Sequence, residues 1–95
     1  MKKLPANVTP YRRTSEFTET SVPKGLLRSH TTKSGTWGEI VVLEGALKYR
    51  ILEPDLEEIY LGPGCHGIVE PSVKHEVQPQ GSVRFYVQFY REGIP

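Results

Sequence analysis

Hydrophobic and polar residues alternate along two segments of the chain. In residues 82–90 every second residue from Val83 to Phe89 is apolar, and residues 46–52 alternate in the same way from Leu47 to Ile51. Successive side chains of a β-strand point to opposite faces, so both segments are predicted to be strands with one buried face.

Shorter segments between turn residues have the composition of further strands. Glu44–Gly45 is predicted to be a hairpin turn between strands at residues 39–43 and 46–52, and Ser34–Gly35 a turn that ends a strand at residues 26–32. The other candidate strands are residues 14–18, 57–61, 67–69 and 75–77. Eight prolines and nine glycines interrupt most windows of helical length, and these residues disfavour helix interiors by about 3 and 1 kcal/mol respectively.

The pattern of short strands and Gly/Pro turns predicts an all-β fold. In a chain of 95 residues, a small antiparallel β-barrel of the jelly-roll type limits the number of open strand edges. We expect a polar N-terminal arm over residues 1–13 and a single domain over residues 14–95.

Composition narrows the classes of partner. The formal net charge of +1 argues against binding to nucleic acid or to a membrane surface. Cys65 is the only cysteine, so it forms no internal disulfide, and a cytoplasmic location is expected. It is expected to be a small, half-buried residue, whereas His66 beside it, in the turn G-P-G-C-H-G, is expected to be exposed.

Two histidines in different predicted strands are candidates for a metal site. His30 and His75 could converge inside a barrel, with an oxygen ligand from Glu39, Glu70 or Glu76. Two histidines and one carboxylate with open coordination positions suit zinc or non-haem iron. The alternative is that each histidine is a surface residue or a hydrogen-bonded residue of the core.

Three segments together resemble a known family. H-T-T-K-S-G-T-W-G-E-I-V-V-L-E-G-A-L-K-Y (residues 30–49), I-V-E-P-S-V-K-H-E-V (68–77) and V-Q-F-Y (87–90) resemble the TehB/YeaR-like cupin domain. That domain occurs fused to the methyltransferase of tellurite-resistance protein B and also as a small free-standing protein. The likeness spans residues 14–91.

The resemblance implies a conical antiparallel barrel, often dimeric, that holds a divalent metal. It implies His30, His75 and Glu70 as metal ligands, with zinc expected first and iron or nickel as alternatives. Thr32 occupies the place of the second histidine of the first cupin motif, and Glu39 comes later than the usual glutamate of that motif.

Three functions remain open from the sequence. The first is a metal-binding cupin domain that binds a small molecule, for example in the response to tellurite or another oxyanion, with Arg28 or Arg50 supplying positive charge. The second is a metal-dependent cupin enzyme of the dioxygenase or isomerase type. The third is a structural or interaction module without metal. A homodimer that binds neither nucleic acid nor a membrane is expected.

Overall fold

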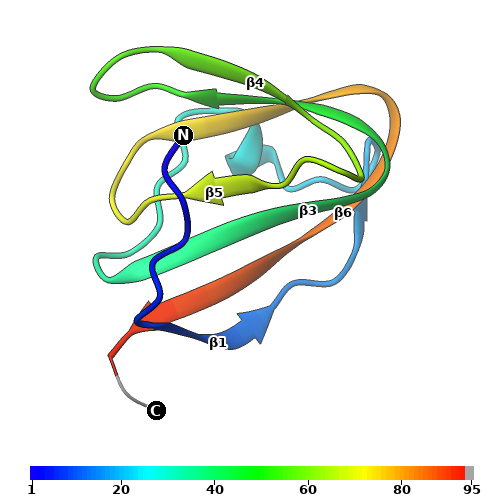
Figure 1. Ribbon diagram of the computed structural model, residues 1–95. Coiled ribbons are helices and arrows are strands. Elements are labelled where there is room, and N and C mark those ends of the chain that lie inside the picture. The colour runs from blue at the N-terminus through cyan, green and yellow to red at the C-terminus, as the bar shows by residue number, and fades with distance from the viewer. Residues whose placement is uncertain (94–95) are drawn as a thin grey trace.

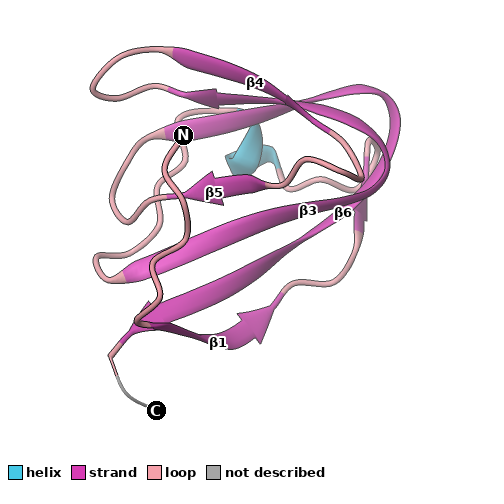
Figure 2. Ribbon diagram, in the orientation of Figure 1, coloured by secondary structure: helices cyan, strands magenta, loops and turns pink. Residues whose placement is uncertain are grey.

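The computed structural model describes residues 1–93, and its strands all pair antiparallel (Figures 1 and 2). The elements in chain order are β1 (Val8–Arg13), β2 (Phe17–Thr18), the 3₁₀ helix η1 (Lys24–Leu27), β3 (Thr36–Ile51), β4 (Glu57–Leu61), β5 (Gly67–Val69) and β6 (His75–Glu92). The all-β antiparallel prediction is confirmed. Strands 57–61 and 67–69 have the predicted bounds.

The strands form a single sheet that is open. Its order is β1-β6-β3-β4, with β2 also paired to β6 and β5 also paired to β3. Within residues 1–93 the end strands β1 and β4 do not pair with each other, so the sheet does not close into a barrel, and the jelly-roll arrangement expected from the sequence stays a prediction.

The two long strands β3 and β6 curve the sheet into two facing halves. They pair with each other from Thr36↔Arg91 to Ile51↔His75, over the whole length of β3. Figure 1 shows both strands crossing the molecule, bending at one end and returning. The apolar side chains of both halves therefore point into one interior.

The predicted hairpin at Glu44–Gly45 is wrong, because the chain passes through these residues as a bulge within β3. The register shifts between Val42 and Glu44 and again between Gly45 and Leu47. Gly45 has φ of 80°, and a Cβ built on it would lie 2.0 Å from the carbonyl oxygen of Ser82. Only glycine permits this backbone conformation and this approach of β6.

The bulge reverses the parity of the buried positions. Even-numbered residues such as Ile40 and Val42 are buried before it, and odd-numbered residues such as Leu47 and Tyr49 after it. This shift keeps both halves of β3 facing one core. The core consists of Ile40, Val42, Leu47, Tyr49, Ile51, Leu61, Val69, Val77, Val83, Phe85 and Val87.

The strand predicted at residues 26–32 is also wrong. Pro23 precedes a single 3₁₀ turn whose first bond runs from the Leu26 N–H to the Pro23 carbonyl (3.0 Å). Ser29, with φ of 37°, then turns the chain, and only His30 makes a β-bridge. Leu26 packs against the core.

The N-terminal residues contact the outer surface of the sheet. The Met1 ammonium pairs with Glu57, and Lys2 Nζ lies 3.2 Å from Glu70 Oε1. Residues 8–13 of the predicted arm form β1 and pair with β6. The division into residues 1–13 and 14–95 stays a prediction, and residues 94–95 lie outside the described residues. No helix within residues 1–93 has the length and apolar character needed to cross a membrane.

Candidate functional site

A cavity of about 220 Å³ lies on the concave face of the sheet. Strands β3, β5 and β6 supply one wall, and residues 14–32 supply the other. Its lining is mostly apolar: Thr14, Phe17, Pro23, Gly25, Leu26, His30, Thr32, Gly38, Ile40, Val69, His75, Val77, Phe85, Val87 and Phe89. Such a lining is typical of sites for small organic molecules.

His75 is the buried polar residue of the cavity wall. It begins β6, is 4% exposed and points inward with Val77, two residues further along. Its Nδ1 lies 3.1 Å from the Val73 carbonyl oxygen. Because a carbonyl oxygen only accepts, Nδ1 bears the hydrogen. Burial lowers the pKa of His75, so the neutral ring presents Nε2 as an acceptor.

His30 is held against His75 by the β-bridge. The His30 N–H donates to the His75 carbonyl (2.7 Å), and the His75 N–H donates to the His30 carbonyl (2.9 Å). The two rings are nearly perpendicular, at 80°, with His30 Nδ1 3.4 Å from His75 Nε2. Since His75 Nε2 accepts, His30 Nδ1 is the donor in this long contact. The predicted convergence of the two histidines is thus seen in the structure.

The candidate carboxylates point away from the histidine pair. Val69 lines the cavity, so its neighbour Glu70 is directed outward, where it meets Lys2. Glu39 accepts from Tyr90 Oη (2.9 Å) and lies 2.9 Å from the ring Nδ1 of exposed His66. Alternation along the strands explains these directions, because Gly38 and Ile40 occupy the inward positions beside Glu39.

The prediction of a bound divalent metal, with zinc expected first, is therefore wrong. In the part of the chain that the structure describes, no three His, Cys, Asp or Glu side chains form a group that could hold a metal ion. The histidines already use Nδ1 and Nε2 of His75 and Nδ1 of His30 in hydrogen bonds. Site roles for His30, His75 and Glu70 stay predictions. Cys65 is exposed and not half-buried as expected.

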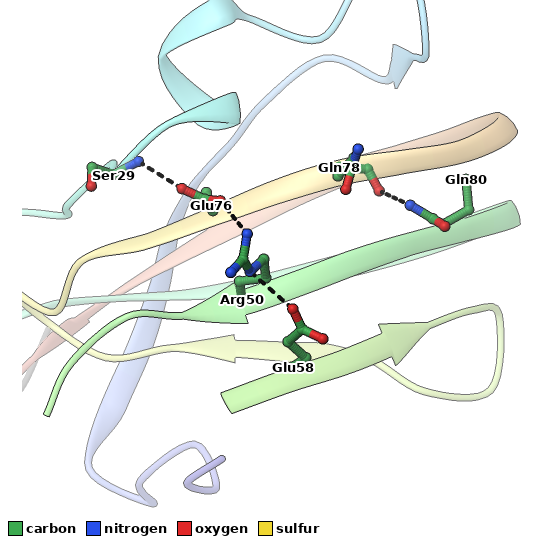
Figure 3. A network of polar contacts seen from close by, with 6 residues as sticks. All are labelled: Ser29, Arg50, Glu58, Glu76, Gln78 and Gln80. Carbon is green, nitrogen blue, oxygen red and sulfur yellow. Dashed lines mark hydrogen bonds and ion pairs between the residues drawn. The ribbon is translucent and has the colours of Figure 1, made fainter. Parts of the chain in front are cut away.

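An ion-pair network that joins β3, β4 and β6 was not predicted from the sequence (Figure 3). Arg50 Nη1 lies 3.2 Å from Glu76 Oε2, and Arg50 Nε lies 3.1 Å from Glu58 Oε2 without the alignment of a hydrogen bond. Glu76 Oε1 also accepts from the Ser29 N–H (3.4 Å), next to His30. Figure 3 also shows a separate contact from Gln80 to the Gln78 carbonyl (3.2 Å).

This network assigns Arg50 to a structural role. It neutralises two carboxylates on the outer face, and it is not directed at a ligand in the cavity as the sequence suggested. The facing positions Arg50↔Glu76 and Arg50↔Glu58 in the sheet explain the ion pairs. Predicting these ion pairs from the sequence would require knowing how β3 is paired in register with β4 and β6.

Thr32 is also structural. Its hydroxyl donates to the Thr36 carbonyl (3.0 Å) and contacts the Glu70 carbonyl (3.3 Å). It thereby fixes the loop after His30 against the end of β5. The aromatic part of the cavity was missed as well: the rings of Phe17 and Phe85 meet edge to face, with centroids 5.6 Å apart.

Comparison with known proteins identifies relatives of this fold. The TehB-like domain model matches residues 12–87. The probable S-adenosyl-L-methionine-dependent methyltransferase TehB of Haemophilus influenzae Rd is 33% identical over 72 residues, 72% of this chain and 25% of that protein. The same protein of strain 10810 is 31% identical over 72 residues, with the same shares covered.

Solved structures agree with this relationship. The crystal structure of TehB from H. influenzae superposes with a TM-score of 0.84 at 29% identity, over 92% of this chain and 32% of that one. A protein from Escherichia coli K12 superposes with a TM-score of 0.88 at 20% identity, over 99% of this chain and 100% of that one, and shows the fold alone.

These relatives correct the predicted function. They are named as methyltransferases, and the metal site that a metal-binding cupin requires is not formed by residues 1–93. The prediction of a metal-binding cupin domain is therefore wrong, and the prediction of a metal-dependent cupin enzyme is wrong for the same reason. This chain spans about a quarter of the curated relatives' length. With the family model matching most of its residues, the chain belongs to the TehB-like domain family.

Proposed function

We propose that this chain is a small ligand-binding β domain that serves an S-adenosylmethionine-dependent methyltransferase. Its cavity would hold a small, uncharged, largely apolar molecule such as a methyl acceptor. The observation that carries the proposal is the apolar cavity of about 220 Å³ beside a hydrogen-bonded histidine pair. The relatives' names supply the methyltransferase context.

S-adenosylmethionine itself does not fit this cavity. The molecule has a sulfonium, an ammonium, a carboxylate and ribose hydroxyls, all of which need polar partners when buried. The cavity lining includes no Asp, Glu, Lys or Arg side chain. We therefore assign the methyl donor to another part of the methyltransferase and the cavity to an apolar molecule.

The expected affinity is modest. A small aromatic molecule that loses about 250 Å² of apolar surface gains roughly 6 kcal/mol at ~25 cal/mol/Å². Association costs at least ~4 kcal/mol in lost freedom, which leaves at most roughly 2 kcal/mol and a dissociation constant on the order of tens of millimolar. Such weak binding is detected by NMR as a progressive shift when the ligand is titrated.

The test uses 4-ethylanisole as an apolar probe, with methyl NMR of the chain. We expect saturable shifts in the methyl groups of Val69, Val77 and Val87, which line the cavity. Leu26→Trp, which adds bulk to the cavity wall, should abolish binding. Leu27→Trp is the matched control, since Leu27 is its neighbour on η1 but is 36% exposed and outside the cavity lining.

Two outcomes would overturn the proposal. One is the absence of saturable shifts from the probe. The other is S-adenosylmethionine shifting the same methyl groups at lower concentration than the probe.

The homodimer, the lack of nucleic-acid binding and the cytoplasmic location stay predictions. Light scattering across a concentration series would test the homodimer.

A further inference from the structure

The two hydroxyl groups in the cavity wall are already hydrogen-bonded. Thr14 Oγ1 donates to the next carbonyl (2.8 Å) and accepts from the Val87 N–H (3.0 Å). Thr32 Oγ1 donates to the Thr36 carbonyl (3.0 Å). Neither hydroxyl offers its hydrogen to a bound molecule.

The histidine pair leaves one ring nitrogen unused. His75 donates from Nδ1 to the Val73 carbonyl and accepts at Nε2 from His30 Nδ1. In neutral His30 the hydrogen on Nδ1 leaves Nε2 as a lone pair. Within residues 1–93, no hydrogen bond is found for that nitrogen, and His30 lines the cavity.

We infer that the cavity selects an apolar molecule with one X–H donor, such as a phenol or a thiol, which donates to His30 Nε2. This inference rests on the proposed function. The direction of the histidine chain is set at its far end, because the Val73 carbonyl can only accept. His75 thus acts as a positioning residue that holds His30 in the tautomer able to receive a ligand hydrogen.

A hydrogen bond to His30 Nε2 would make the cavity bind a methyl acceptor more tightly than its methylated product. Methylation replaces X–H by X–CH₃ and removes the hydrogen that the ligand donates to His30 Nε2. Loss of that one hydrogen bond corresponds to roughly a five- to tenfold change in dissociation constant.

The experiment compares 4-ethylphenol with 4-ethylanisole, its methylated counterpart, by NMR titration. The titrations are run at about pH 8, because a neutral imidazole has a ring nitrogen that can accept a hydrogen bond and an imidazolium has none. The affinity ratio of phenol to anisole should fall about five- to tenfold in His30→Phe relative to the unaltered chain. His66→Phe is the matched control, since exposed His66 lies outside the cavity lining and should leave the ratio unchanged.

A second measurement does not depend on the variant folding. In ¹⁵N spectra of the unaltered chain, the His30 Nε2 resonance should shift on addition of the phenol and not of the anisole. An equal response to both probes, or an affinity ratio that persists in folded His30→Phe, would overturn the inference and leave the proposed function standing. If neither probe binds, both the inference and the proposed function are overturned.

Discussion

Gly45 offers the most direct test of the folding argument. Gly45→Ala adds a Cβ at φ of 80°, and that atom would lie 2.0 Å from the Ser82 carbonyl oxygen. The left-handed backbone alone costs a non-glycine residue about 1–2 kcal/mol. The contact adds about 1–3 kcal/mol, because β3 and β6 must separate at the bulge. We expect a total loss of roughly 2–5 kcal/mol, a large part of the ~5–15 kcal/mol that stabilises a typical domain.

Two other glycines provide matched controls. Gly81 has the same φ of 80° but nothing within 4 Å of a built Cβ, so Gly81→Ala should show only the backbone cost of about 1–2 kcal/mol. Gly64 has neither a positive φ nor a close neighbour, so Gly64→Ala should stay within about 0.5 kcal/mol of the unaltered chain.

The assay is urea unfolding followed by circular dichroism, with the free energy of unfolding extrapolated to water for all four proteins. A loss in Gly45→Ala that is no larger than the loss in Gly81→Ala would refute the steric argument. It would mean that the strands adjust at the bulge without cost.

Three further predictions concern the interior and the outer network. Tyr49→Phe removes the hydrogen bond from Tyr49 Oη to a β5 carbonyl (2.8 Å) and should lower the free energy of unfolding by about 1–2 kcal/mol. An unchanged midpoint of urea unfolding would contradict this prediction. Burial lowers the pKa of His75, so the unfolded chain takes up a proton more readily than the folded chain, and the free energy of unfolding should fall as the pH drops below 6.5. NMR titration of the folded chain should place the pKa of His75 below 6.5, and a higher value would refute the assignment. Glu76→Ala should cost about 1 kcal/mol and Glu58→Ala under about 0.5 kcal/mol, because only Glu76 also accepts from the Ser29 N–H. Equal losses in urea unfolding would count against that role.

Alternation along the strands was enough to predict much of the candidate site. His75 and Val77 share one face, and the structure places both in the cavity wall. The same rule could have directed Glu70 outward, since Val69 precedes it on β5. The family resemblance led instead to Glu70 as a metal ligand, and its carboxylate meets Lys2 outside the cavity.

The sequence by itself determined the all-β class and the inward face of most strands, because strand alternation is a local property of the chain. Only the tertiary structure decided that Gly45 forms a bulge and not a turn, since that depends on β6 lying beside β3 along its whole length. It also decided the partners of His30, Arg50 and Glu76. These side chains are brought together by pairing between distant segments, and no local pattern specifies that register.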